Sequence, residues 1–136
     1  MRPTRTPKRS WTRRLALIAM VALLAGALSE RVSAVAAWSS LAAFELLASS
    51  ERYAWPASAF LPNALREIDL PELAAALAGA GKELLIVEPL DAERRPLGRA
   101  QAAELYAQGD GGPTVLAGAS VDQAIARIEE LLNRKR

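Results

Sequence analysis

The sequence predicts an α/β fold: a small single domain with a short, partly parallel sheet flanked by helices, after an N-terminal signal helix. Three observations predict this class. The chain has 136 residues, of which 51% are hydrophobic, which suits one packed domain. Two short apolar runs alternate with helical patterns over residues 69–133, and capping residues, Gly and Pro mark the boundaries between them. Strands that are each followed by a helix favour parallel neighbours with right-handed connections.

Residues 1–36 have the three parts of a secretory signal peptide. Six Arg and Lys residues and no acid precede residue 15, the run at 15–28 is apolar, and small residues at 32–36 resemble an Ala-x-Ala cleavage site. A helix over 15–28 reaches roughly 21 Å, less than the roughly 30 Å of a bilayer core. We therefore expect export, with a mature chain that begins near Val35 or Ala37.

Two alternatives to this signal remain open. Residues 15–28 could stay as an uncleaved inner-membrane anchor and contact the membrane, with residues 32–38 lengthening the span. The stretch Thr12-Arg13-Arg14-Leu15 also resembles part of a twin-arginine export signal, although an alanine follows where that signal usually has a bulky apolar residue.

Removal of the signal would change the charge of the protein. It takes away seven of the 17 basic residues and one of the 15 acidic residues, which leaves 10 and 14 and a net charge of −4. Nucleic-acid binding needs a basic stripe on the folded part, so we expect no nucleic-acid partner. The basic end Arg134-Lys135-Arg136 suits the last turn of a helix.

Residues 37–68 are predicted as a helix followed by an irregular connector rich in Pro and aromatic residues. The helix begins at Ser39 or Ser40 and ends at Ser49-Ser50. We expect one more strand from residues 51–61, or from a partner chain, because two strands are too few for an independent sheet.

The aromatic residues of this connector allow two interpretations. Tyr53 and Trp55 are candidate partner-binding residues because they could form an adhesive surface. The alternative is that the aromatic side chains pack over the core, which a small domain needs for its buried area.

Residues 69–136 are predicted as a compact α/β unit. Asp69-Leu70-Pro71-Glu72 is a helix start, and glycines at 79 and 81 end that helix. A buried strand follows at 83–88, a helix at 99–108, a Gly-rich turn at 109–113, and a second strand at 114–117. A capping box at Ser120 opens the last helix, which ends near Asn133. Its apolar stripe should be buried, with Ile125 and Ile128 facing the core.

Residues 84–115 resemble the second half of a thioredoxin-like domain. The resemblance rests on the apolar strand 85–87, on Ala102, Ala103 and Tyr106, and on Gly112-Pro113-Thr114 before the next apolar strand. It implies a cis peptide bond at Pro113 and a backbone at Gly112, Pro113 and Thr114 that is offered to a partner strand or peptide. This chain lacks the family's cysteines and its first βαβ unit, so the resemblance implies no redox chemistry.

The composition excludes several chemistries. The sequence has no Cys and no His, so we expect no thiol catalysis, no Ser-His arrangement and no Cys/His metal site. The Gly-rich turn lacks the Lys and Ser/Thr of a phosphate-binding loop. Glu88, Asp91 and Glu93 follow the end of a strand, where α/β sheets often have their binding or active sites. The alternative interpretation, that these are simply solvated surface acids, is the commoner one. We expect no catalytic, cofactor-binding or metal-binding residues.

The function expected from the sequence is an exported, noncatalytic binding or assembly module of a bacterial-type envelope, with protein partners there. Two alternatives stay open. One is a degenerate, cysteine-less thioredoxin-like protein, and the other is a small membrane-anchored accessory protein.

Overall fold

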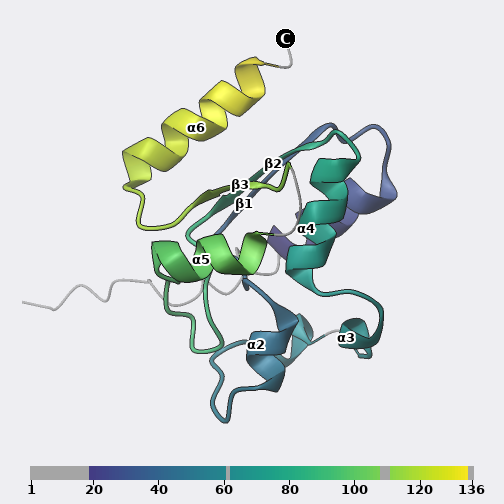
Figure 1. The fold of residues 1–136 in the computed structure, drawn as a ribbon, viewed down its shortest axis with the longest axis vertical. Helices are drawn as coiled ribbons and strands as arrows, with labels where there is room; N and C mark the ends of the chain where they lie inside the picture. The colour runs from purple at the N-terminus through teal and green to yellow at the C-terminus, as the bar shows by residue number, and fades with distance from the viewer. Residues whose placement is uncertain (1–18, 61, 108–110, 135–136) are drawn as a thin grey trace, which may run out of the picture.

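The computed structural model describes residues 19–60, 62–107 and 111–134, and it confirms the α/β class. Three parallel strands in the order β1-β2-β3 form one sheet with helices on both faces (Figure 1). A helix over residues 19–28 comes first. The labelled elements that follow are β1 (Ala34–Trp38), α2 (Phe44–Ala48), a 3₁₀ turn (Ala57–Ala59), α3 (Ala64–Glu67), α4 (Leu70–Gly79), β2 (Glu83–Val87), α5 (Arg99–Tyr106), β3 (Thr114–Leu116) and α6 (Val121–Asn133).

The central strand β2 is the apolar run found in the sequence. Its residues 84–87 are buried, as expected of a parallel strand with helices on both faces. It pairs with β1 over Ala34↔Glu83 to Trp38↔Val87, and with β3 over Leu85↔Thr114 to Val87↔Leu116.

The third strand is not where the sequence suggested. Residues 51–61 contain no strand among those described, and β1 at Ala34–Trp38 supplies it instead. The run Ala-Val-Ala-Ala-Trp has the apolar character of an internal strand, but its position after the N-terminal apolar segment favoured a signal-peptide interpretation.

The helix expected from Ser39 or Ser40 is also shorter than predicted. Leu41 makes a parallel bridge with Leu90, and the Leu90 N–H donates to the Ser40 carbonyl at 2.8 Å. This pairing keeps the chain extended beyond β1, so α2 begins only at Phe44.

One face of the sheet carries the main core. Helix 19–28, α4 and α5 cover it, and their apolar side chains pack on Val35, Ala37, Leu84 and Ile86 of the strands. In Figure 1 α4 and α5 lie on this side of the sheet, and α6 lies on the other. The helices contribute Ala19, Met20, Leu23, Leu70, Leu73, Ala74, Leu77 and Tyr106.

The opposite face has a much smaller cover, and here the expected burial of the α6 stripe is wrong. Ala124 is buried against Leu85 and Val87, and Ile128 is half-buried. Ile125 is 44% exposed, so it faces away from the core that the sequence analysis assigned to it. No second helix of the described chain lies beside α6 on this face, so one side of its apolar arc packs on the strands and the other side stays open.

Asp69 links the starts of two helices that are distant in sequence. Its carboxylate accepts the N–H of Leu70 in α4 at 2.6 Å, as the sequence predicted. It also accepts the N–H groups of Phe44 at 2.6 Å and Glu45 at 3.1 Å, both in α2. One side chain thus satisfies donors that each helix start otherwise leaves without a partner.

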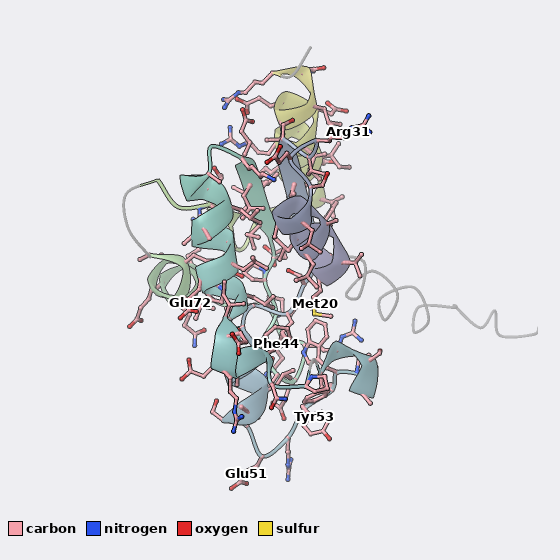
Figure 2. All side chains as sticks on the ribbon, turned by 90° about the vertical axis from the view of Figure 1, so that its right-hand side faces the viewer. Met20, Arg31, Phe44, Glu51, Tyr53 and Glu72 are labelled. Atoms are coloured by element: carbon pink, nitrogen blue, oxygen red, sulfur yellow. The ribbon has the colours of Figure 1, made fainter. Side chains whose placement is uncertain are left out.

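Much of the expected signal peptide, residues 1–18, lies outside the described residues, but helix 19–28 is part of the fold. Met20 and Leu23 are buried, and the ammonium group of Lys82 donates to the carbonyls of Gly26 and Ser29 at the end of this helix. Figure 2 shows the helix running from Met20 toward Arg31 alongside α4. None of the helices in the described part of the chain is long and apolar enough to cross a membrane.

Candidate functional site

The two aromatic candidates have different surroundings. Trp55 is buried, and its indole N–H donates to the Asp91 carbonyl at 2.8 Å while the Arg94 guanidinium lies 5.1 Å from its ring centre. Tyr53 is 58% exposed and packs edge-on against Phe60, with ring centres 5.0 Å apart. Trp55 therefore belongs to the core, as the alternative interpretation held, and Tyr53 lies on the surface.

Gly112, Pro113 and Thr114 lead into β3 at the amino end of the sheet. Gly112 and Thr114 are exposed, and Thr114 pairs with Leu85 of β2. The bond between Gly112 and Pro113 is trans, so the cis bond implied by the thioredoxin resemblance is absent.

The five predicted residues do not form one site. Trp55 bonds to the loop that follows the carboxyl end of β2, whereas Gly112 to Thr114 lie at the amino end of β3. Because the strands are parallel, these two groups lie at opposite ends of the sheet. Figure 2 shows Tyr53 at the end of the molecule away from Arg31, which precedes β1.

A cleft of about 220 Å³ lies beside Gly112 and Thr114, but its charged groups are already paired. The Glu130 carboxylate bonds to the guanidinium groups of Arg127 and Arg134. Hydrogen bonds from these two arginines, together with their charge, lower the pKa of Glu130. The cleft therefore offers a ligand little unpaired charge.

A larger groove of about 590 Å³ lies along β3 between α5 and α6. We call it the β3 groove, and its lining residues are Arg99, Ala102, Ala103, Val115, Leu116, Ala117, Ala119, Gln123, Ala126 and Arg127. Five of these ten are alanines, so much of the lining is small and apolar.

The base of the β3 groove is a strand edge. The Glu88 N–H donates to the Leu116 carbonyl, which shows that Leu116 turns its backbone groups toward β2. Because successive residues of a strand alternate, the N–H and C=O of Val115 point away from β2. The Ala117 carbonyl, next on that side, accepts from Arg99 Nε at 3.2 Å. Within β3, the backbone groups that point away from the described sheet are therefore those of Val115.

The acids at the carboxyl end of β2 have structural partners. Glu88, whose backbone has a φ of 49°, accepts the Ala119 N–H at 2.9 Å through its carboxylate. Asp91 and Glu93 both form ion pairs with Arg95, at 3.0 and 2.8 Å. Among the residues that the structure describes, no group of His, Cys, Asp and Glu side chains is arranged to hold a metal ion. These acids therefore hold loops in place through protein partners, whereas the sequence favoured solvated side chains.

Gly112 to Thr114 are candidates from the sequence, but no sequence signal predicts the β3 groove, which is lined by the next residues of the same strand, Val115 and Leu116. The sequence marks Ala102 and Ala103 only as part of the thioredoxin resemblance, because Ala on a short helix gives no signal for binding. Only the positions of α5 and α6 on either side of β3 turn these alanines into groove walls.

Comparison of this chain with protein-family models, with curated proteins and with solved structures found no match in any of the three.

Proposed function

We propose that this protein is a noncatalytic binding module of an exported assembly, and that it binds an extended segment of its partner along β3. The observation that carries the proposal is the open edge of β3 at the base of the β3 groove. Binding of this kind takes its affinity from main-chain hydrogen bonds and its specificity from the flanking side chains. The position of Gly112, Pro113 and Thr114 at the entrance to this edge supports the partner-binding role expected of them.

The groove favours a particular kind of segment. Its alanine walls accept small apolar side chains, and the guanidinium group of Arg99 belongs to its lining. The other arginine of the lining, Arg127, is already paired with Glu130. Opposite charges that meet across an interface favour the matching partner over others. We therefore propose an extended segment with small residues facing the walls and an acidic residue near Arg99.

A peptide library tests this proposal. Peptides selected on the full chain from a displayed random library should be acidic and extended. They should lose at least about tenfold in affinity to Ala103→Arg, which fills the groove, a loss of about 1.4 kcal/mol. Ala100→Arg places the same side chain at another exposed position of α5 outside the groove and should leave the affinity unchanged. Selected peptides that bind both variants equally well would refute the β3 groove as the site.

We also propose that the protein is located in the envelope, and the fold limits where a signal peptide could be cleaved without loss of described elements. A cut near Val35 or Ala37 falls inside β1 and would remove helix 19–28 with the start of that strand. N-terminal sequencing of the protein from the envelope fraction decides this point. A mature chain that begins at or before residue 19 keeps the described fold, whereas one that begins at Val35 or Ala37 must fold without these parts. Full-length protein found in the cytosol alone would contradict export.

A further inference from the structure

The outer edge of β1 is open among the described residues. The Glu83 N–H donates to the Ser33 carbonyl and the Ser39 N–H donates to the Val87 carbonyl, so the odd-numbered residues of β1 face β2. By alternation, the backbone N–H and C=O groups of Ala34, Ala36 and Trp38 point away from the sheet. No described strand pairs with them.

The residues of β1 themselves carry none of the usual features that protect an edge strand. Edge strands of monomeric proteins commonly carry a Lys, a Pro, an inward charge or a bulge that prevents pairing with another chain. The residues of β1 are Ala-Val-Ala-Ala-Trp, which include no charge and no proline, and the pairing with β2 runs through all five without a bulge. An apolar, regular and unprotected edge favours pairing with another strand.

The exposed apolar side of α6 faces the same edge. Val121, Ile125 and Leu132 are 60%, 44% and 64% exposed and lie within about 40° of one another around the helix. The opposite side of α6 lines the β3 groove and the neighbouring cleft through Gln123, Arg127, Glu130 and Arg134. Since that side is toward β3, the apolar stripe is toward β1.

Side chains of β1 extend this apolar surface on the sheet. Trp38 is half-buried beside the cluster that α6 forms with Leu85 and Val87, and Ala36 on the same face is exposed. The half of this sheet face that lies over β1 therefore has an apolar floor and an apolar side wall. An apolar sheet face is normally covered by a further layer of helices or strands.

We propose that the occupant of this surface is a second copy of the chain, paired antiparallel through β1 about a two-fold axis at Ala36. The outward groups lie symmetrically about Ala36, so Ala36 pairs with itself and Ala34 pairs with Trp38 of the other copy. Each of these three pairs exchanges two N–H to C=O bonds, and the two sheets become one of six strands.

The same axis accounts for the apolar stripe of α6. It places both α6 helices on one face of the joined sheet and antiparallel, with each stripe toward the other copy. Trp38 of each copy then fills the space between the helices, near the end of the other α6 at Leu132. Asp122 and Glu129 are exposed on the side of α6 that faces away from the sheet, next to the stripe. In the dimer, water and salt would therefore screen the repulsion between the carboxylates of the two copies. The β1 edge can pair with the β1 edge of a second copy, and the same two-fold axis brings the two apolar stripes together. One axis thus satisfies both surfaces, which favours a second copy over an unrelated partner.

Sedimentation equilibrium of the full chain tests the dimer. We expect twice the monomer mass at micromolar concentrations. Ala36→Lys, which adds a protecting charge to the edge, and Ile125→Glu, which breaks the stripe, should each weaken dimerisation at least tenfold. Asn133→Glu, on the outward side of α6, and Ala103→Arg, in the β3 groove, should leave it unchanged.

A cysteine placed on the axis tests the register. The chain has no cysteine, so Ala36→Cys provides one thiol per copy, at a pair whose Cα atoms should be about 5.5 Å apart, within reach of a disulfide. Under mild oxidation this variant should become a covalent dimer within the time in which Ala100→Cys stays monomeric. A chain that is monomeric at about 100 μM, a dimer indifferent to Ala36→Lys and Ile125→Glu, or equal crosslinking of the two cysteine variants would each overturn the proposal. Peptide binding by the β3 groove is measured separately with Ala103→Arg, so either proposal can fail alone.

Discussion

Replacement of Asp69 by alanine should destabilise the fold more than the loss of an ordinary helix cap. The Asp69 carboxylate accepts the Leu70 N–H at the start of α4 and the Phe44 N–H at the start of α2, both at 2.6 Å. Loss of an N-cap costs about 1 kcal/mol. The Phe44 N–H is partly buried, and leaving such a donor without an acceptor adds about 1–3 kcal/mol.

The expected loss for Asp69→Ala is therefore about 2–4 kcal/mol, a large part of the roughly 5–15 kcal/mol of a typical domain. The third bond, from the exposed Glu45 N–H at 3.1 Å, adds little because water can replace the carboxylate there. The matched control is Ser120→Ala, because the Ser120 hydroxyl accepts one N–H, that of Gln123 at 3.2 Å, and serves only α6. That control should cost about 1 kcal/mol.

Urea titration followed by circular dichroism measures both free energies of unfolding. Asp69→Asn keeps an oxygen that can accept from both helices, so it should recover most of what Asp69→Ala loses. Equal losses for Asp69→Ala and Ser120→Ala would refute the shared cap, because the bond to α2 would then contribute nothing. An Asp69→Asn variant as unstable as Asp69→Ala would show that charge, and not the shared acceptor, is what matters.

Three further predictions concern side chains of the core and its borders. Burial, and then the charge of Asp69, raise the pKa of Tyr106 above that of the unfolded chain. The contribution of this group to the unfolding free energy should therefore be constant up to about pH 10 and decrease at higher pH, where the unfolded chain loses the proton first. Tyr106→Phe should remove that fall in alkaline urea titrations, and an unchanged fall would assign it to other groups. Lys82→Met should cost about 1–2 kcal/mol and speed amide hydrogen exchange in helix 19–28, because the ammonium group bonds to carbonyls at its end; exchange that stays as slow as in the parent would contradict the tether. Ile128→Ala should cost about 1–2 kcal/mol in urea, less than the about 2–5 kcal/mol of a fully buried isoleucine, because Ile128 is only half-buried.

Local sequence signals were sufficient to predict the main helices and the central strand in the second half of the chain. The caps at Asp69 and Ser120 and the apolar run of β2 set α4, α6 and the central strand, and the structure has them where the sequence placed them. Each of these signals is a short-range rule, since a capping side chain or a buried run acts within a few residues.

The first half was decided by contacts between distant segments. An apolar helix followed by Ala-Val-Ala-Ala-Trp has the same composition whether it is a removable signal or a core helix and strand. The pairing of Ala34–Trp38 with β2 and the bonds from Lys82 to the end of helix 19–28 make it part of the described fold. These partners lie about 50 residues away in sequence, so no local pattern could reveal them.

The candidate sites depend on the same distinction. The thioredoxin resemblance implied a cis bond at Pro113 that offers the backbone of Gly112 to Thr114 to a partner. The structure has a trans bond there and puts these residues at the start of β3, which has no second neighbour among the described strands. The alanine walls of the β3 groove and the exposure of Ile125 were decided only in three dimensions. The helical period fixes which residues of α6 share a side. Only the tertiary structure determines which side is covered, and because no other described helix packs beside α6, the rest of its apolar arc stays open.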